Sequence, residues 1–466
     1  MKGHSILLNA VCWLLFVCFA PASVLYVDVN STNPVPPYAD WSTAATNIQD
    51  AVDVATNGSI VLVTNGIYAT GGRLFGGMTN RVAITNSVTL RSVNGPGTTI
   101  IEGSPVIGTN AVRCVWLGNG ALLSGFTLTN GATLGAVGGS PKTTQNGGGA
   151  YCFSSLSVLS NCNVCGNAAY FWGGGIIYGT AKACRLIGNS AASGGGAYLT
   201  AMNNCLLFSN TASTSGGGAV RGTLNNCTLV GNTASTGGGV DGSSDGVLNN
   251  CIVYSNTASS GPNYSGTYAF HFALNNCCTV PLATNGVGNF TNEPLFVNFA
   301  AGNFRLQTNS PCINAGNNAY MSGGTDLDGR PRKVGGMVDM GAYEFQAAGM
   351  GEFIAWLQQS GLPTDGSADY LDSDGDRMNN WQEWIAGTNP TNAASVLLLA
   401  SPSNSVSGIT VTWQSVSGVT YYLQRSTNFP AFTSLQSNLV GQAGSTSYTD
   451  TTATSGGLCF YRVGVQ

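Results

Sequence analysis

Two sequence markers recur along the middle of the chain at a shared interval, and they constrain the fold more than any other feature. Gly triplets, spaced 21 to 26 residues apart, begin at Gly147, Gly173, Gly194, Gly216 and Gly237. Cysteines keep step with them at Cys162, Cys184, Cys205, Cys227, Cys251 and Cys277. Two residue types that share one period indicate repeated units, each stacked on the next.

Each repeat has the composition of short strands joined by turns. Phrases such as "NNCLLFSNTASTSGGGAV" and "NNCTLVGNTASTGGGV" lack the apolar spacing of a helix and are rich in Thr, Val, Asn and Gly. One unit cannot bury its own apolar face, so its neighbours must cover it. Parallel strands lie ~4.8 Å apart, which would align the cysteines and the asparagines into ladders. The repeats therefore predict a right-handed parallel β-helix in an all-β protein.

The start of the chain predicts export. Lys2 precedes an apolar run that ends in the small residues Ala20-Pro21-Ala22, which together indicate a signal peptide over residues 1–22. We therefore expect a secreted or cell-surface protein, with no membrane span left after cleavage.

The sequence on either side of the repeats predicts other kinds of structure. A helix at about 40–55 is expected to cap the β-helix, and a helix with an acidic loop should join it to a small β-sandwich of the fibronectin type III or immunoglobulin kind. The predicted segments are the β-helix over 23–346 with a C-terminal cap at about 290–346, the helix and acidic calcium loop over 347–395, and the sandwich over 396–466.

Charge is scarce and excludes some partners. Only 8% of residues are charged, the net charge is −4, and no run of Lys or Arg occurs. Nucleic acid is therefore excluded as an expected partner. We expect a monomer whose partner is a polysaccharide or a cell-surface component.

Three stretches resemble known bacterial proteins. "YVDVN…WSTAATNIQDAVDVATNGSIVLVTNGIY" resembles the start of right-handed β-helix proteins of the pectin-lyase-like fold, and "GGGAV" and "FSN" are similar to repeats of polymorphic outer-membrane autotransporter passengers. "NEPLFVN…NFRLQTNSPCINAGNN…DLDGRPRKVGGMVDMGAYEF" resembles the end of β-helix proteins with a choice-of-anchor Q domain. The resemblance covers about Leu25 to Phe345. It implies fold and export, but no single activity, because the fold hosts lyases, hydrolases and adhesins.

The repeats offer few groups for catalysis. Uronate lyases of the resembled fold use carboxylate-bound calcium and an Arg or Lys base, yet the acids between Ser104 and Asn292 are Asp241 and Asp245 alone. Arg221 and Asp241 follow consecutive Gly triplets, which places them on adjacent coils. A surface ion pair is the favoured interpretation. The alternative is a degenerate calcium-dependent lyase site with Arg221 as base and Asp241 and Asp245 on the metal.

Aromatic residues near the triplets suggest a binding function instead. Sugar rings stack on aromatic faces, although stacking between coils would use the same residues. The candidates for carbohydrate binding are Tyr151, Trp172, Tyr178 and Tyr198. We therefore expect a glycan-binding or adhesive protein without catalysis. The alternative is a lyase or glycoside hydrolase acting on acidic polysaccharide.

An acidic loop after the repeats has the spacing of an EF-hand. Its predicted ligands, at loop positions 1, 3, 5, 7, 9 and 12, are Asp372, Asp374, Asp376, the Met378 carbonyl, Asn380 and Glu383. Hard oxygen ligands at this spacing suit a structural Ca²⁺. The segment resembles dockerin-like and thrombospondin-type-3-like calcium loops. Position 6, usually Gly, is Arg377, so a weaker site or a different turn is expected.

The cysteines divide into two groups. The six that keep the repeat period are expected to be buried and reduced, one above another. Cys278 and Cys312 are candidates for a disulfide that would pin the C-terminal cap, which export permits.

Overall fold

The computed structural model describes most of the chain, and the predicted signal peptide lies outside the described part. The described residues are 23–136, 143–266, 272–333, 337–346, 350–363, 368, 371–405, 407–428, 431–453 and 459–466. The chain forms two compact units, which meet in sequence between Asn292 and Glu293. Within the described ranges, no helix has the length and apolar character needed to cross a membrane.

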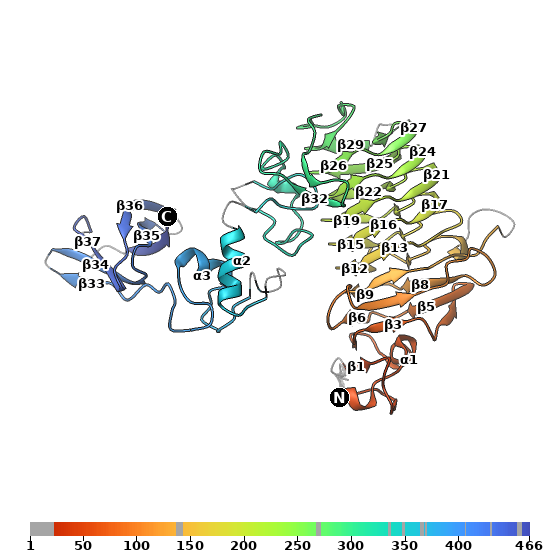
Figure 1. Ribbon diagram of the computed structural model, residues 1–466, viewed down its shortest axis with the longest axis horizontal. Coiled ribbons are helices and arrows are strands. Elements are labelled where there is room, and N and C mark those ends of the chain that lie inside the picture. The colour runs from red at the N-terminus through yellow and green to blue at the C-terminus, as the bar shows by residue number, and fades with distance from the viewer. Residues whose placement is uncertain are drawn as a thin grey trace, which may run out of the picture. The chain divides into compact units, whose positions relative to one another are not determined.

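The first unit is a parallel β-helix with three sheets (Figure 1). The 17-stranded sheet contains β1 (Val24–Val27), β2 (Ile60–Val63), β4 (Arg73–Phe75), β5 (Met78–Ile84), β6 (Thr89–Ser92), β8 (Val112–Leu117), β9 (Leu122–Ser124), β11 (Ala150–Cys152), β12 (Val158–Ser160), β14 (Ile176–Ile177), β15 (Thr180–Lys182), β18 (Ala197–Tyr198), β19 (Ala201–Asn203), β22 (Ala219–Asn225), β25 (Val240–Asn249), β28 (Tyr264–Ser265) and β29 (Phe272–Asn275).

The two smaller sheets complete each coil. The nine-stranded sheet contains β3 (Gly66–Tyr68), β7 (Thr99–Glu102), β10 (Thr127–Thr129), β13 (Asn163–Cys165), β16 (Arg185–Ile187), β20 (Leu206–Phe208), β23 (Thr228–Val230), β26 (Ile252–Tyr254) and β30 (Cys278–Thr279). The four-stranded sheet contains β17 (Ser190–Ser193), β21 (Thr211–Ser215), β24 (Thr233–Thr236) and β27 (Thr257–Ser260). The strands in these two sheets pair in parallel, as do those of the large sheet apart from the β4–β5 hairpin. The predicted parallel β-helix is confirmed.

Every second residue of a strand points into the core, where equivalent residues of successive coils meet. Along the large sheet, one such row is fully buried and pairs in register through Leu159, Ala181, Met202, Leu224 and Leu248. Because alternate residues of each strand face inward, the inward residues of stacked strands form a continuous apolar column.

The repeated "NNC" sequence makes the corner between the two larger sheets. Its first Asn faces outward and donates to the equivalent Asn of the preceding coil, as Asn225 Nδ2 does to Asn203 Oδ1 at 3.0 Å. Its second Asn takes the left-handed conformation, with φ of 53° at Asn204 and 52° at Asn226, which Asn tolerates better than most residues. The cysteine that follows points inward.

The predicted cysteine ladder is present. All six repeat cysteines are free thiols, and each is at most 1% exposed. Burial raises the pKa of the Cys162 thiol well above its usual range. A thiol that is both buried and protonated is inert toward oxidants, which explains how a reduced ladder fits a protein predicted to be exported.

The predicted disulfide is not formed in the structure. Cys278 and Cys312 are both buried, and neither forms a disulfide in the structure. The Cys278 thiol donates to the carbonyl oxygen of Asn292 at 3.1 Å, within its own unit. The Cys278–Cys312 bridge therefore stays a prediction.

A second ladder consists of buried asparagine side chains. Each Nδ2 donates to the Oδ1 of the next coil at 2.9 to 3.1 Å, through Asn167, Asn189, Asn210, Asn232, Asn256 and Asn263. The backbone N–H of Asn189 donates to the same Asn210 oxygen at 3.0 Å. The ladder therefore satisfies buried backbone groups as well as its own amides.

The Gly triplets are required by two different constraints. Gly194 has φ of +67°, which disfavours any residue with a Cβ. A Cβ on Gly196 would lie 2.5 Å from the carbonyl oxygen of Gly218 on the next coil. The first Gly thus makes the turn, and the others let neighbouring backbones approach.

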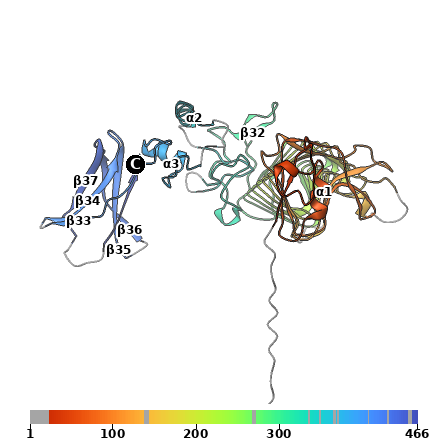
Figure 2. The same cartoon turned by 90° about the horizontal axis from the view of Figure 1, so that it is seen from below.

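A short helix lies at one end of the stack (Figure 2). Helix α1 (Ile48–Val54) follows the 3₁₀ turn η1 (Trp41–Thr43) and begins after the N-cap Asn47. Gln49 fixes α1 to β5, because its Oε1 accepts from the Ala83 N–H at 2.7 Å. A helix is therefore present within the residues predicted for the cap. A second 3₁₀ turn, η2 (Thr143–Gln145), precedes the first Gly triplet.

The second unit begins with a hairpin and a network of buried charges. The hairpin pairs β31 (Phe296–Asn298) with β32 (Asn303–Leu306), and η3 (Asn318–Tyr320) follows. Arg332 is fully buried and donates to the carbonyl oxygens of Asp339 and Gly341, both at 2.7 Å. Asp339 accepts from the backbone N–H of Asn314 at 2.7 Å, although burial raises its pKa to about 6.

The unit ends in two helices and two antiparallel sheets. The elements are α2 (Met350–Gln359), α3 (Asn380–Ala386), the sheet β33 (Ser403–Ser405), β34 (Gly408–Ser415) and β37 (Gly444–Asp450), and the sheet β36 (Ala431–Val440), β35 (Thr420–Asn428) and β38 (Phe460–Val465). Trp413 and Tyr421, one from each sheet, are fully buried with ring centroids 5.9 Å apart. The predicted small β-sandwich is confirmed.

We predict that the buried asparagine ladder contributes more stability than the outer one. Asn210→Ala removes the acceptor of the buried Asn189 N–H and the donor to the Leu186 carbonyl oxygen, both on the preceding coil, and each buried group left unpaired costs ~1–3 kcal/mol. We expect a loss of at least ~2 kcal/mol in the free energy of unfolding, measured by denaturant titration. The matched control is Asn225→Ala, because Asn225 and its acceptor Asn203 are partly exposed and can bond to water. Equal losses in both variants would contradict the prediction.

Candidate functional site

The acidic loop is supported by aromatic packing between two helices. Phe353 of α2 contacts Trp381 and Trp384 of α3, with ring centroids 4.8 and 5.5 Å apart. Helix α3 starts with a capping box between Asn379 and Gln382 and ends at Gly387, which has φ of 71°. The loop between the helices is therefore held at both ends, and α3 fixes the position of Glu383.

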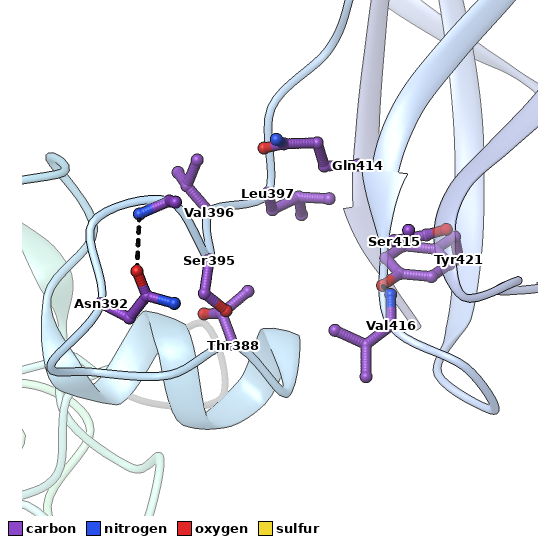
Figure 3. Close-up of a pocket in the computed structure, with 11 residues that line it drawn as sticks. Thr388, Asn392, Ser395, Val396, Leu397, Gln414, Ser415, Val416 and Tyr421 are labelled. Carbon is purple, nitrogen blue, oxygen red and sulfur yellow. Dashed lines mark hydrogen bonds between the residues drawn. The ribbon is translucent and has the colours of Figure 1, made fainter.

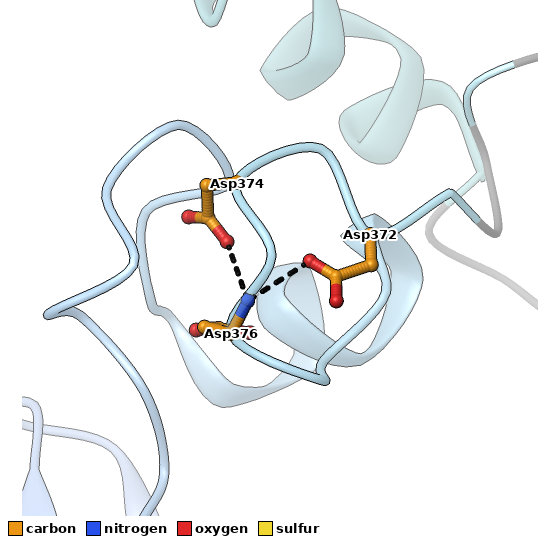
Figure 4. Close-up of side chains that lie close together, drawn as sticks. All are labelled: Asp372, Asp374 and Asp376. Atoms are coloured by element: carbon orange, nitrogen blue, oxygen red, sulfur yellow. Dashed lines mark hydrogen bonds between the residues drawn. The ribbon is translucent and has the colours of Figure 1, made fainter.

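Three aspartates converge within this loop (Figure 4). The nearest carboxylate oxygens of Asp372, Asp374 and Asp376 all lie within 4.8 Å of one another. Asp372 accepts from the backbone N–H groups of Gly375 at 2.7 Å and Arg377 at 2.9 Å, and these bonds lower its pKa. The group can hold a metal ion.

Buried oxygen atoms in the loop lack partners that a cation would supply. Asp374 Oδ2, Asp376 Oδ2 and Glu383 Oε2 are buried and make no hydrogen bond. Glu383 is fully buried, and its pKa rises to about 7 because of that burial and the charges of Asp374 and Asp376. Carboxylates that are crowded, buried and unpaired fit a hard cation with oxygen ligands.

Arg377 occupies the position that normally carries Gly, and it takes the conformation of that Gly. Its φ is +80°, which costs a residue with a side chain ~1–2 kcal/mol. The turn is therefore of the expected kind despite the substitution. Asn380 Nδ2 donates to the Ala368 carbonyl oxygen at 2.7 Å, while its Oδ1 is buried without a partner. The ligand roles of Met378 and Asn380 remain predictions.

We predict that the metal-free loop loses stability as the pH rises. The pKa of Glu383 is raised from 4.5 to about 7 in the folded protein, so the fold favours the protonated form. This contribution is present below the ordinary carboxyl pKa and is lost as the pH rises toward 7. Melting curves of chelator-treated protein between pH 5 and pH 8 should show the fall, and Glu383→Gln should flatten it. An equal pH dependence in both proteins would contradict this assignment.

The outer face of the 17-stranded sheet carries the second candidate site. One outward row pairs in register from coil to coil through Ala83, Trp116, Tyr151, Ile177, Tyr198, Val220, Asp241 and Ser265. The residues next to them, such as Ala150 and Ile176, belong to the core. The row contains two of the predicted carbohydrate-binding residues and one of the predicted catalytic residues.

The aromatic rings of this face stack on one another. Trp116 and Tyr151 stack at 4.3 Å with 6° between their planes, and Trp172 and Tyr198 stack at 4.9 Å with 8°. Tyr151 is only 7% exposed, whereas Trp172, Tyr178 and Tyr198 are partly exposed. Stacking between coils is therefore present, and three of the four predicted residues still present ring surface to solvent.

Arg113 is a buried residue that the sequence analysis missed. It is 0% exposed, and its guanidinium lies 5.2 Å from the Tyr151 ring centroid. It donates to the carbonyl oxygens of Gly147 at 2.8 Å and Thr143 at 2.7 Å, and burial lowers its pKa to about 9. Its role is to fasten the segment before the first Gly triplet to the aromatic face.

The three predicted catalytic residues come together at a break in strand register. Val220 pairs with Asp241, and Gly222 pairs with Gly246, so β25 contains extra residues opposite Arg221. Asp241 is buried and precedes this insertion, whereas Asp245 is exposed and is its last residue. Arg221 has φ of 56°, and its Nε is buried without a hydrogen bond. Arg221 and Asp241 both influence the pKa of Tyr198, which burial raises.

A pocket in the second unit offers no charged chemistry (Figure 3). Thr388, Ser395 and Leu397 line it from the segment after α3, and Ser415 and Tyr421 line it from the sandwich. Its lining contains no charged side chain. It is therefore a weaker candidate than the acidic loop or the outer face.

Comparison with known proteins gives only distant structural similarities. No family model and no curated protein matches the chain. Among solved structures, a pectate lyase Pel9A is similar at a TM-score of 0.38 and 14% identity, covering 70% of this chain and 97% of that one. A rhamnogalacturonan lyase is similar at 0.32 and 11%, covering 55% and 68%. The pectin methylesterase PemA from Erwinia chrysanthemi is similar at 0.30 and 12%, covering 56% and 80%. Similarities of this size carry no argument about activity.

Proposed function

We propose that this chain is a secreted or cell-surface protein that binds a polysaccharide along the outer face of its 17-stranded sheet, and that its second unit holds a structural Ca²⁺. The observation that carries the binding function is the group of partly exposed rings on adjacent coils, Trp172, Tyr178 and Tyr198. We call this group the aromatic platform.

The aromatic platform supports sugar binding because its rings are already ordered. Trp172 and Tyr198 hold each other by stacking at 4.9 Å, and the Tyr178 backbone N–H donates to the Tyr198 carbonyl oxygen at 2.9 Å. A ligand that stacks on fixed rings loses little of its binding energy to ordering them. Tyr198 lies in β18, and Trp172 and Tyr178 lie outside the strands but pair through their backbones with Ser193 and Tyr198 of the next coil, an arrangement that suits an extended chain of sugars.

The charge beside the platform supports an acidic ligand. Arg221 lies one residue beyond the outward row, next to Val220, which pairs with Tyr198. A guanidinium matches the geometry of a carboxylate better than any other side chain. The proposed ligand is therefore a polysaccharide that contains uronic acids.

We predict that truncating the platform weakens binding without unfolding the protein. Trp172→Ala removes one stacking surface, worth ~1 kcal/mol, so affinity for an acidic polysaccharide should fall about fivefold or more. Affinity electrophoresis against acidic and neutral polysaccharides measures this. Phe153→Ala is the matched control, because Phe153 is 65% exposed and does not belong to the platform. Equal losses in both variants would place the site elsewhere.

A calcium-dependent lyase is the second candidate, and the register break at Arg221 favours it. Asp241 precedes the insertion opposite Arg221 and Asp245 ends it, so the two could share a cation, leaving Arg221 as base. Two carboxylates are few for Ca²⁺, which takes six to eight oxygens. Incubating the protein with an acidic polysaccharide distinguishes the two functions. If the protein releases unsaturated product and Arg221→Ala does not, the function is catalysis. If the polymer is unchanged, the result supports binding.

The Ca²⁺ of the second unit would be held by the carboxylates of Asp372, Asp374, Asp376 and Glu383. Ca²⁺ would supply partners to the buried oxygens and offset the repulsion among these charges. The metal would have a structural role, because the loop lies between α2 and α3 and the loop's carboxylates would all be used to bind the ion.

We predict calcium binding that depends on the buried carboxylate. Calorimetry should show heat at millimolar Ca²⁺ or below, with a rise in melting temperature. Glu383→Gln should abolish both. Glu352→Gln is the matched control, because Glu352 is an exposed carboxylate of α2. The absence of heat and of a thermal shift in the unaltered protein would disprove the calcium site.

A further inference from the structure

A second pocket of the second unit borders the acidic loop and differs in chemistry from the uncharged pocket of Figure 3. Its volume is about 490 Å³, within the ~300–1,000 Å³ range of pockets that hold small molecules. We call it the Arg377 pocket, and the lining residues that matter here are Arg377, Met378, Ile385, Leu397, Tyr422 and Val465. Among the described residues that line it, Arg377 alone is charged.

The walls of the Arg377 pocket are joined by hydrogen bonds. The Leu397 N–H donates to the Met378 sulfur at 3.3 Å, which fastens the acidic loop to the segment after α3. That segment pairs in turn with the sandwich, since the Gln414 N–H donates to the Leu398 carbonyl oxygen at 2.9 Å. The pocket is therefore formed by elements that are bonded to one another.

Most of the lining is apolar, which favours a ligand with an apolar body. Ile385 of α3 is 46% exposed, so it can give apolar surface to a ligand. The Tyr422 ring lies against the backbone of β38, because a Cβ on Gly464 would be 2.4 Å from Tyr422 Cζ. Val465 follows in the same strand. Aliphatic side chains beside an ordered ring suit a flat, apolar ligand.

Arg377 gives the pocket a positive charge that is available to a ligand. In the part of the chain that the structure describes, its guanidinium forms no ion pair and no hydrogen bond, and only its backbone N–H is used, by Asp372. Gly would make the same turn, with φ of +80°, without strain, so the loop does not need this side chain. A guanidinium can donate two parallel hydrogen bonds to a carboxylate. The charge therefore selects an anion.

We propose that the Arg377 pocket binds a small aromatic carboxylate, whose carboxylate pairs with the Arg377 guanidinium while its rings lie against the apolar walls. A neutral aromatic molecule would leave the guanidinium unpaired. A uronic acid fits less well, because its hydroxyl groups would lose their water against apolar side chains. The site is separate from the aromatic platform, which belongs to the first unit, and it does not depend on polysaccharide binding.

The test uses 2-naphthoate, an aromatic carboxylate whose own fluorescence reports binding, and 2-naphthylmethanol, a neutral molecule of nearly the same shape. The full chain is titrated with each in the presence of Ca²⁺, which would neutralise the loop carboxylates beside Arg377. We expect one naphthoate site per chain. The alcohol should bind about tenfold more weakly or worse, because it cannot form the charged pair.

Arg377→Gly separates loss of the charge from damage to the fold. Gly is the residue that this turn favours, so the variant should melt at the same temperature or higher. Its affinity for naphthoate should fall about tenfold or more, to the level of the alcohol.

Ile385→Ser tests the apolar wall and should weaken the binding of both ligands about fivefold. Leu398→Ser is the matched control, because Leu398 is 56% exposed and does not line the pocket.

Four results would overturn the proposal. They are equal naphthoate affinity in the unaltered chain and Arg377→Gly, equal affinity for the carboxylate and the alcohol, equal losses in Ile385→Ser and Leu398→Ser, and no binding at millimolar naphthoate. Binding that is lost in Trp172→Ala and kept in Arg377→Gly would also overturn it, since it would place naphthoate on the aromatic platform. Calcium binding is measured separately by calorimetry on the unaltered chain, so failure of the calcium site is distinguished from failure of this pocket.

Discussion

Hydrogen bonding between successive coils in register is the constraint on which the rest of the first unit depends. The Gly196 N–H donates to the Gly217 carbonyl oxygen at 3.1 Å, and the Gly218 N–H donates to the Gly238 carbonyl oxygen at 3.0 Å. Once the backbones are this close, each side chain touches its own equivalent on the coils above and below. A residue is therefore acceptable only if it packs well against copies of itself, as Leu, Cys, Asn and Gly do here.

The predicted catalytic residues lie where the register between successive coils is interrupted. The register between β22 and β25 shifts next to Arg221, and the extra residues of β25 separate Asp241 from Asp245. The acidic loop shows the opposite situation. There, buried oxygens of Asp374, Asp376 and Glu383 have no hydrogen-bond partner, so the loop suits a hard cation and does not depend on stacked copies of one residue.

The structural features that depend on the repeat period could be predicted from the sequence. The column of cysteines, the amide ladder and the close approach at Gly196 all derive from one period and one strand spacing. The burial of Arg113 could not be predicted, because its partners are carbonyl groups of Thr143 and Gly147, some thirty positions away, and carbonyls leave no mark in a sequence. The left-handed turn at Arg377 was in doubt because Gly usually takes it. The disulfide was expected because export permits one and because it would pin the C-terminal cap, whereas in the structure the Cys278 thiol donates to the Asn292 carbonyl oxygen.

The buried asparagine ladder also has a direction. The amide-to-amide bonds from Asn167 to Asn263 all run from an Nδ2 to an Oδ1 on the C-terminal side. Five of these Nδ2 groups also donate a second hydrogen to a carbonyl oxygen of the preceding coil, as Asn210 does to Leu186 at 2.9 Å. Hydrogen bonds that are aligned along a chain polarise one another. The two ends of the ladder are hydrogen-bonded within the fold. Asn167 Oδ1 accepts from the Gly131 N–H at 2.8 Å, and Asn263 Nδ2 donates to the Val280 carbonyl oxygen at 2.7 Å. In an almost uncharged protein, this ladder of amide-to-amide bonds therefore has one direction along the axis of the β-helix.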